Sequence, residues 1–149
     1  MTPSQSVETL SKITDGLKTR YMKLVNEFSD SSVVDVLSLS IPKRLSPYQF
    51  HFNDLYRKSQ EISDDLDELY YNKMLSYKVG QSELSVVDLN SSEIKRMIES
   101  SEDYRMLKQK YDQIVADMKI VEEMISTIKN FSFNVNNSLK FKELTGGSA

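Results

Sequence analysis

Apolar residues recur along this chain at alternating steps of three and four, which is the spacing of one helix face in a coiled coil. The strongest stripe has no polar interruption over four heptads. Its members are Tyr104, Leu107, Tyr111, Ile114, Met118, Val121, Ile125 and Ile128. The segment Ser100–Asp103 before it is rich in helix-capping residues, and Asn130 follows it. The pattern therefore predicts a long helix between these two points.

Two weaker stripes predict two more long helices. One runs from Val7 to Phe28 and is interrupted by Thr14 and by the helix-weakening Gly16. The other runs from Tyr48 to Lys73, and Gly80 is expected to end its helix.

Capping boxes, in which a polar side chain and a Gln or Glu three residues later bond to each other's backbone, predict where helices begin. Thr2–Gln5 and Ser46–Gln49 have this pattern, each with proline at the first helical position. Asn90–Glu93 repeats it before a short helix that is expected to reach Glu99.

Three other segments favour a different conformation. Apolar and polar residues alternate in Val33–Ile41 and again in Phe131–Asn136, the period of an extended chain, and Ser82–Leu89 is expected to be a loop. Pro42 restricts Ile41 to extended conformations. The predicted fold class is all-α (mainly), with long coiled-coil-like helices and short extended segments.

Composition excludes most catalytic chemistry. The 149 residues make one domain, contain no cysteine and include a single histidine, so thiolate nucleophiles and sites with two histidines are excluded. No phosphate-binding loop or nucleophile elbow is present, and His51 is expected at the surface or an interface. We expect no enzyme, no cofactor and no metal. No leader or membrane span is visible in the sequence, so an intracellular, soluble protein is expected.

One acidic cluster bears on the expectation that the protein binds no metal. Glu61, Asp64, Asp65, Asp67 and Glu68 follow one another without a basic residue between them. Some would share a helix face, where a divalent cation could bind. A solvated helix face is the favoured interpretation, because no second cluster of ligands exists.

The net charge of −3 does not indicate a nucleic-acid-binding protein, but the basic residues are clustered. Around the second helix, lysine and arginine alternate with tyrosine, the combination that neutralises phosphates and stacks on bases of single-stranded DNA. The candidate DNA-binding residues are Arg57, Lys58, Lys73, Lys78, Tyr70 and Tyr71. Other basic clusters are Lys43 and Arg44, then Arg105, Lys108 and Lys110, and finally Lys129, Lys140 and Lys142.

The width of the stripes suggests self-association. Three narrow stripes with few apolar residues outside them are not expected to fill a globular interior, so a homo-oligomer is expected. The predicted subunit interface is the third stripe (Tyr104, Leu107, Tyr111, Ile114, Met118, Val121, Ile125 and Ile128) together with Phe133 and Val135.

Several short motifs in this order resemble one family. They are Leu39–Pro42 before a helix, the pair Tyr70–Tyr71 with Lys73 behind it, Ser92–Lys95, Ser101–Asp103, and the tail Asn130–Asn137 followed by Leu139, Phe141, Leu144 and Gly146. Together the segments from Ser38 to Gly146 resemble the recombination mediators of large tailed phages, the UvsY-like family. The resemblance divides the chain into an N-terminal helix and linker (1–32), a mediator domain (33–146) and a flexible tail (147–149).

The resemblance implies a function and its partners. Such proteins bind single-stranded DNA as ring-like homo-oligomers of about six or seven subunits, in the cytoplasm of the infected bacterium. They help the phage recombinase to displace the phage single-strand-binding protein, and they make or break no bond.

Two positions depart from the family pattern. Where the family carries basic residues before the tyrosine pair, this chain has Asp65, Asp67 and Glu68, and Phe131 replaces a common arginine. DNA contact is therefore assigned to the basic candidates above, or is weaker. The alternative is a coiled-coil assembly or adaptor protein without DNA affinity, which the net charge suits better.

Overall fold

The computed structural model describes residues 5–28, 34–84 and 90–144. Over these residues the chain forms four helices: α1 (Val7–Phe28), α2 (Val34–Leu84), α3 (Ser91–Ser100) and α4 (Glu102–Leu144). No strand occurs in these three ranges. The prediction of a mainly α-helical fold is thus confirmed.

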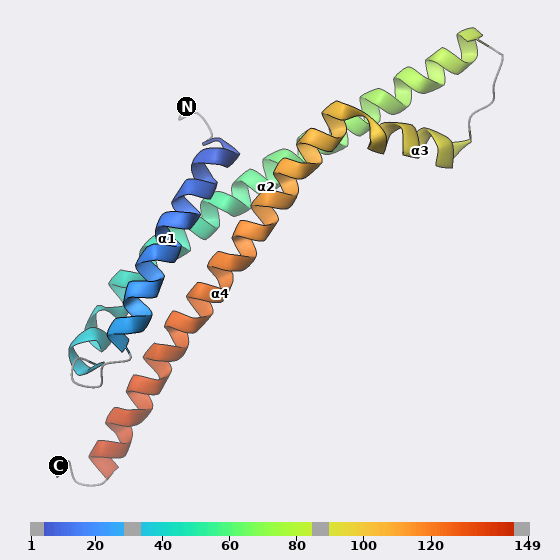
Figure 1. The fold of residues 1–149 in the computed structure, drawn as a ribbon. Helices are drawn as coiled ribbons and strands as arrows, with labels where there is room; N and C mark the ends of the chain where they lie inside the picture. Colours follow the sequence, from blue (N-terminus) through green and yellow to red (C-terminus); the bar gives the residue numbers. More distant parts are fainter. Residues whose placement is uncertain (1–4, 29–33, 85–89, 145–149) are drawn as a thin grey trace.

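The molecule is elongated (Figure 1). Helices α2 and α4 run antiparallel along most of its length, and α1 packs against both of them. At the end of the molecule away from α1, α3 lies beside the C-terminal part of α2 and leads into α4. Only part of the length is therefore three helices thick.

The core is formed mainly by the three predicted stripes, which meet one another inside a single chain, and Ile41, Leu45 and Met124 add to them. Its buried members come from α1, α2 and α4: Val7, Leu10, Leu17, Leu24, Ile41, Leu45, Tyr48, Leu55, Ile62, Leu66, Ile114, Val121, Met124 and Ile128. Steps of seven separate Leu10, Leu17 and Leu24, as the heptad pattern requires. Three narrow stripes can therefore bury much of their apolar surface against one another within one chain, contrary to expectation, and self-association stays a prediction.

The N-terminal part of α2 corrects the prediction of an extended segment. Residues from Val34 to Ile41 are helical, and Ser46 lies inside α2 instead of capping it. Pro42 and Pro47 lie within the helix, where each lacks the N–H that would bond to the preceding turn. Such short apolar runs fit both periods, and Ile41 follows the helical one because it packs in the core.

The end of α4 corrects a second extended segment. Asn130 does not end the helix, which continues through Phe131–Asn136 to Leu144. Phe131 packs against the core, so the stripe gains one more turn beyond Ile128. Gly80 likewise lies inside α2, which ends at Leu84, and residues 85–89 of the expected loop lie outside the described residues. Isolated glycine and asparagine weaken a helix but do not end it when neighbouring turns are packed.

The capping prediction holds best at α3. The side chain of Asn90 accepts a hydrogen bond from Glu93 N (2.9 Å), and the Glu93 carboxylate accepts one from Asn90 N (3.3 Å). Helix α4 begins at Glu102, close to its predicted start. At α1 the hydroxyl of Ser6 accepts from Thr9 N at 3.2 Å, whereas the box expected at Thr2–Gln5 includes residues outside the described ranges.

Gly16 offers a simple test of α1. A methyl group added there would meet nothing within 4 Å, and the residue lies in mid-helix. Gly16→Ala is expected to raise the free energy of unfolding by about 0.5–1 kcal/mol, because alanine loses less backbone entropy in a helix. Urea denaturation, with the slope m unchanged and the midpoint higher, would bear this out. A lower midpoint would mean that this part of α1 is not a stable helix.

A buried polar pair connects α1 to α2 and corrects the expectation for His51. The side chain of His51 is only 4% exposed, and its Nε2 lies 2.7 Å from the hydroxyl of Thr14. Thr14 donates to the carbonyl oxygen of Leu10 (3.1 Å), so its hydroxyl accepts from Nε2 and Nδ1 carries no proton. Thr14, the polar interruption of the first stripe, is thus a specific partner in the core.

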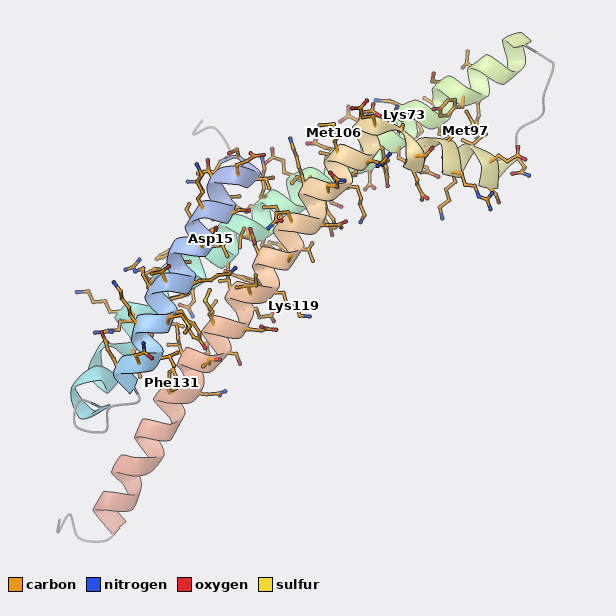
Figure 2. All side chains as sticks on the ribbon, in the orientation of Figure 1. Asp15, Lys73, Met97, Met106, Lys119 and Phe131 are labelled. Carbon is orange, nitrogen blue, oxygen red and sulfur yellow. The ribbon has the colours of Figure 1, made fainter. Side chains whose placement is uncertain are left out.

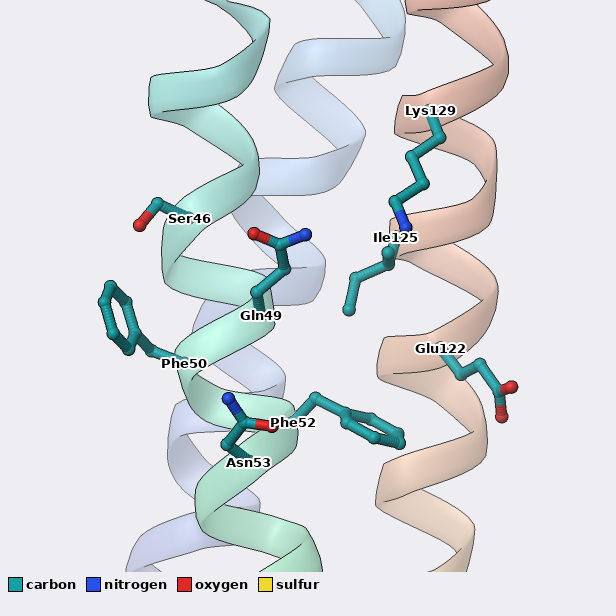
Figure 3. A pocket seen from close by; sticks show the side chains of 8 residues that line it. All are labelled: Ser46, Gln49, Phe50, Phe52, Asn53, Glu122, Ile125 and Lys129. Atoms are coloured by element: carbon teal, nitrogen blue, oxygen red, sulfur yellow. The ribbon is translucent and has the colours of Figure 1, made fainter.

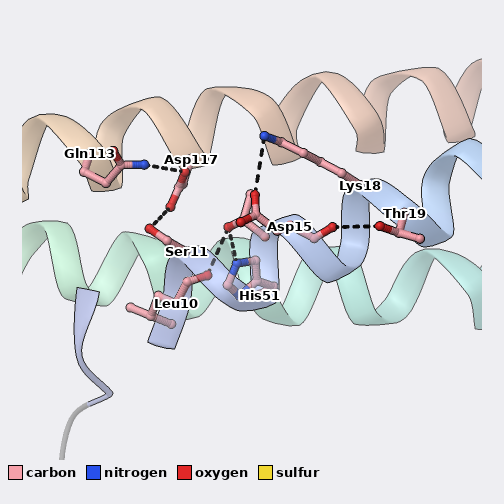
Figure 4. Close-up of polar contacts among 9 residues, drawn as sticks. Leu10, Ser11, Asp15, Lys18, Thr19, His51, Gln113 and Asp117 are labelled. Atoms are coloured by element: carbon pink, nitrogen blue, oxygen red, sulfur yellow. Dashed lines mark hydrogen bonds and ion pairs between the residues drawn. The ribbon is translucent and has the colours of Figure 1, made fainter. Parts of the chain in front are cut away.

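Asp117 joins this layer from α4. It is buried, and its carboxylate accepts hydrogen bonds from Ser11 (2.8 Å) and Gln113 (3.0 Å), as Figure 4 shows. Polar side chains from all three long helices therefore meet in one layer of the bundle. An unpaired polar group in the core raises the free energy of the folded protein. This layer therefore favours the one register of the three helices in which these groups are paired.

Candidate nucleic-acid interface

One line of exposed residues follows the outer face of α2. Its members are seven residues apart, close to two helical turns, so that each faces nearly the same way as the next: Lys43, Phe50, Arg57, Asp64, Tyr71 and Lys78. All six are exposed, with Phe50 at 69% and Tyr71 at 60%. Successive members are about 10.5 Å apart along the helix. We call this set the outer line of α2.

Three of the predicted DNA-binding residues belong to this line. Arg57, Tyr71 and Lys78 are exposed, and no ion pair of Arg57 or Lys78 occurs among the described residues. Two cations and one aromatic ring are therefore presented together to solvent, the combination that a single nucleic-acid strand can use.

The other three predicted residues face elsewhere and have partners within the chain. Lys58 Nζ lies 3.3 Å from a carboxylate oxygen of Glu61 on the next turn. Tyr70 makes an edge-to-face contact with Tyr104 of α4, with 6.3 Å between ring centroids. The charge of Lys58 and the ring of Tyr70 are thus already in contact with other residues of the protein.

Lys73 connects the far part of α2 to the start of α4. Its Nζ is 3.0 Å from a carboxylate oxygen of Asp103, and this hydrogen bond is the main reason that the pKa of Asp103 is lowered. Figure 2 shows Lys73 near Met97 and Met106, at the opposite end of the molecule from Phe131. Lys73 therefore has a structural partner at the helix junction, and the six candidates do not form one cluster.

Two members of the line were not among the DNA-binding candidates: Lys43 was assigned to a separate basic cluster with Arg44, and Phe50 was not singled out. The signal was present, because counting back in sevens from Tyr71 and Arg57 gives Phe50 and then Lys43. It was obscured by the expectation that residues before Ser46 were not helical. Asp64 is the single acid in the line.

The acidic cluster is a solvated helix face, as favoured. Glu61, Asp64, Asp65, Asp67 and Glu68 are all exposed. Within the described ranges, no three histidine or acidic side chains are arranged to hold a metal ion. Within the same ranges, no helix combines the length and the apolar character needed to cross a bilayer.

The predicted interface residues whose side chains are described divide into two groups. Ile114, Val121 and Ile128 are fully buried within the chain and so cannot directly contact a second subunit in this fold. Tyr104, Leu107, Tyr111, Met118 and Ile125 are partly buried against the same core. The side chains of Phe133 and Val135 lie outside those described.

The other basic clusters are partly engaged. Lys108 pairs with Asp112 at 3.3 Å and lies 4.9 Å from the ring centroid of Tyr111. Arg44 pairs with Glu27 across α1 and α2. The side chains of Lys140 and Lys142 are not described. Arg105, Lys110 and Lys129 are exposed, and no ion pair of theirs occurs among the described residues. The outer line of α2 is the candidate surface because it combines cations with exposed aromatic rings along one helix. It belongs to an elongated helical protein with a face suited to a single nucleic-acid strand.

Comparison with known proteins agrees with this description. The family model described as "Recombination, repair and ssDNA binding protein UvsY" matches residues 25–148. The chain belongs to this family, and the resemblance inferred from the motifs is confirmed. Neither the curated proteins nor the solved structures compared with the chain gave a match. Most of α1 precedes the matched region.

Proposed function

We propose that the protein is a recombination mediator that binds single-stranded DNA along the outer line of α2. In this function it acts as a homo-oligomer and helps a phage recombinase to assemble on a strand covered by the phage single-strand-binding protein. The observation that carries the proposal is the family match over residues 25–148, and the outer line supplies a surface for the strand. The protein acts by binding, without catalysis or cofactor, in the host cytoplasm.

The chemistry of the outer line fits this role. Lysine and arginine neutralise backbone phosphates, and each aromatic face can stack on any base, so binding requires no particular sequence. The acidic cluster, which includes Asp64 of the line itself, weakens the positive field of the line. A mediator must release its strand to the recombinase, and moderate affinity in each subunit, summed over an oligomer, suits that transfer.

Subunit contacts are proposed for the stripe residues that the core leaves partly accessible. These are Tyr104, Leu107, Tyr111, Met118 and Ile125, continued by Phe133 and Val135 on the same helix. A ring of six or seven subunits would repeat each outer line around one axis and add their fields.

Fluorescence anisotropy with labelled oligo-dT at several salt concentrations tests the DNA surface. The double variant Arg57→Ala/Lys78→Ala is expected to weaken binding and to flatten the plot of log affinity against log salt. Each lost phosphate contact should change that slope by about 0.7 for every subunit engaged. The matched control is Lys58→Ala/Lys73→Ala, which removes the same charge from residues already paired within the chain.

A smaller effect is expected in the control than in the test variant. Equal losses in both would mean that net charge, and not the outer line, determines affinity. If the wild-type protein binds no oligo-dT even at low salt, the mediator proposal fails. The coiled-coil adaptor, favoured by the net charge of −3, would then be the better interpretation.

A further inference from the structure

A groove of about 480 Å³ lies between α2 and α4 near the N-terminal end of the outer line. Figure 3 shows its walls. Gln49, Phe50, Phe52 and Asn53 come from α2, whereas Ile125 and Lys129 come from α4. The groove thus joins one member of the outer line to a basic residue on a different helix.

Phe50 is the unusual residue of this groove. Its side chain is 69% exposed, whereas Phe52, two residues later, is partly buried against the core. In Figure 3 the ring of Phe52 points toward α4 and the ring of Phe50 points away from it. The fold therefore uses Phe52 for packing and leaves the face of Phe50 available to a ligand.

Polar groups suited to a nucleobase line the same groove. The exposed amides of Gln49 and Asn53 each offer donors and an acceptor, the groups that meet the edge of a base. The side chain of Lys129 extends along the groove toward Ile125, and no ion pair of Lys129 occurs among the described residues. Glu122 also lines the groove, but its carboxylate points away from α2 in Figure 3.

Cations lie on both sides of Phe50 along the same helix. Lys43 precedes it by two turns and Arg57 follows it by two turns. Lys129 adds a third basic side chain on the opposite wall of the groove. A strand that follows the outer line would bring its backbone to these cations and a base to Phe50.

We propose that this groove is a nucleobase subsite for single-stranded DNA. One base stacks on Phe50 with its edge toward Gln49 and Asn53, and the neighbouring phosphates contact Lys43, Arg57 and Lys129. This inference rests on the proposed DNA-binding function and adds a base-stacking site to it. A second protein copy fits less well, because interface centres are depleted in lysine and glutamate, which this groove contains.

The test compares labelled oligo-dT with an abasic oligonucleotide of the same length, which has the same phosphates but no bases. The wild-type protein is expected to prefer oligo-dT by about 5- to 150-fold, the range for one stacked base. Phe50→Ala should lower this preference to the part that Tyr71 supplies, and should leave abasic binding unchanged. The control Phe50→Tyr should keep it, because tyrosine has an equivalent aromatic face. Phe50 is exposed, so neither substitution should disturb folding.

Other outcomes separate this inference from the function on which it rests. If the wild-type protein binds neither oligonucleotide, both proposals fail. If it binds oligo-dT and Phe50→Ala keeps the full preference, or if no preference exists, the subsite is wrong while DNA binding stands. A lower mass of Phe50→Ala in light scattering would identify the groove as a subunit interface and would also overturn the proposal.

Discussion

Ile114→Ala is expected to lower the free energy of unfolding by about 2–5 kcal/mol, the usual cost of truncating a buried isoleucine. Ile114 is completely buried and belongs to the core cluster shared by α1, α2 and α4. Removing three carbons there leaves a cavity in the middle of the bundle, and long helices held only by narrow stripes have little freedom to close it. Chemical denaturation followed by circular dichroism measures the loss.

Val115→Ala is the matched control, because Val115 is the next residue of α4 and is 42% exposed. It should change the free energy of unfolding by about 0.5 kcal/mol or less. Sedimentation of both variants under native conditions then separates core from interface. If Ile114→Ala changed the oligomer mass but left the unfolding free energy of each subunit unaffected, the stripe would be a subunit interface and the described packing would be wrong.

The sequence predicted the heptad stripes of this fold but not which helices would cover them. The heptad stripes of α1, α2 and α4 were recognised correctly, because the period of apolar residues follows directly from helix geometry. A stripe does not reveal whether its partner helix belongs to the same chain or to another copy. The expected interface residues Val121 and Ile128, like Ile114, proved to be core residues for that reason.

Local conformation at the ends of helices was harder to predict. Apolar residues alternate with polar ones at 33–41 and 131–136, a pattern that fits an extended chain. In the structure, the packed helices α2 and α4 continue through most of these segments. The proline at position 42 shifted the expectation further from the observed helix. Tertiary packing of Ile41 and Phe131 decided both cases, and no local rule contains that information.

The candidate DNA surface was predicted in part. Residue type and spacing selected Arg57, Tyr71 and Lys78, which are exposed on one helix, and their contact with DNA stays a prediction. The Lys58–Glu61 pair could have been anticipated from its spacing of three on a helix. The contact between Lys73 and Asp103 could not, because thirty positions separate the two residues and only the crossing of α2 with α4 brings them together.

The burial of His51 could not be predicted either, because it depends on the packing of α1 against α2. This burial is expected to make the stability of the protein depend on pH. The wild-type protein should lose stability as the pH falls from 8 to 5. Burial lowers the pKa of His51, and the nearby carboxylates of Asp54 and Asp117 and the carbonyl of Leu10 oppose that shift only in part. Nδ1 is buried without a hydrogen-bond partner among the described residues, so a proton added there would find no acceptor.

The sign of this pH dependence follows from the difference in proton binding between the folded and unfolded states. In the unfolded chain His51 takes up its proton near its ordinary pKa of about 6.5, whereas the folded protein takes it up only at lower pH. Between those two values the unfolded state holds more protons, so the free energy of unfolding falls as the pH falls. The maximum slope is about 1.4 kcal/mol per pH unit for one group. Above pH 6.5 the full stabilisation is present, and it is lost progressively below that pH.

His51→Gln is the variant that isolates this effect. The terminal amide of glutamine can donate to the hydroxyl of Thr14 as Nε2 does, but it does not titrate. Urea denaturation at several pH values from 5 to 8 should give a shallower pH dependence for the variant than for the wild type. Carboxylates titrate mostly below this range and affect both proteins alike, so the difference between the two curves reports on His51 alone. Identical slopes would show that His51 takes up its proton equally well in the folded and unfolded states, and the buried Thr14–His51 pair would then be incorrect.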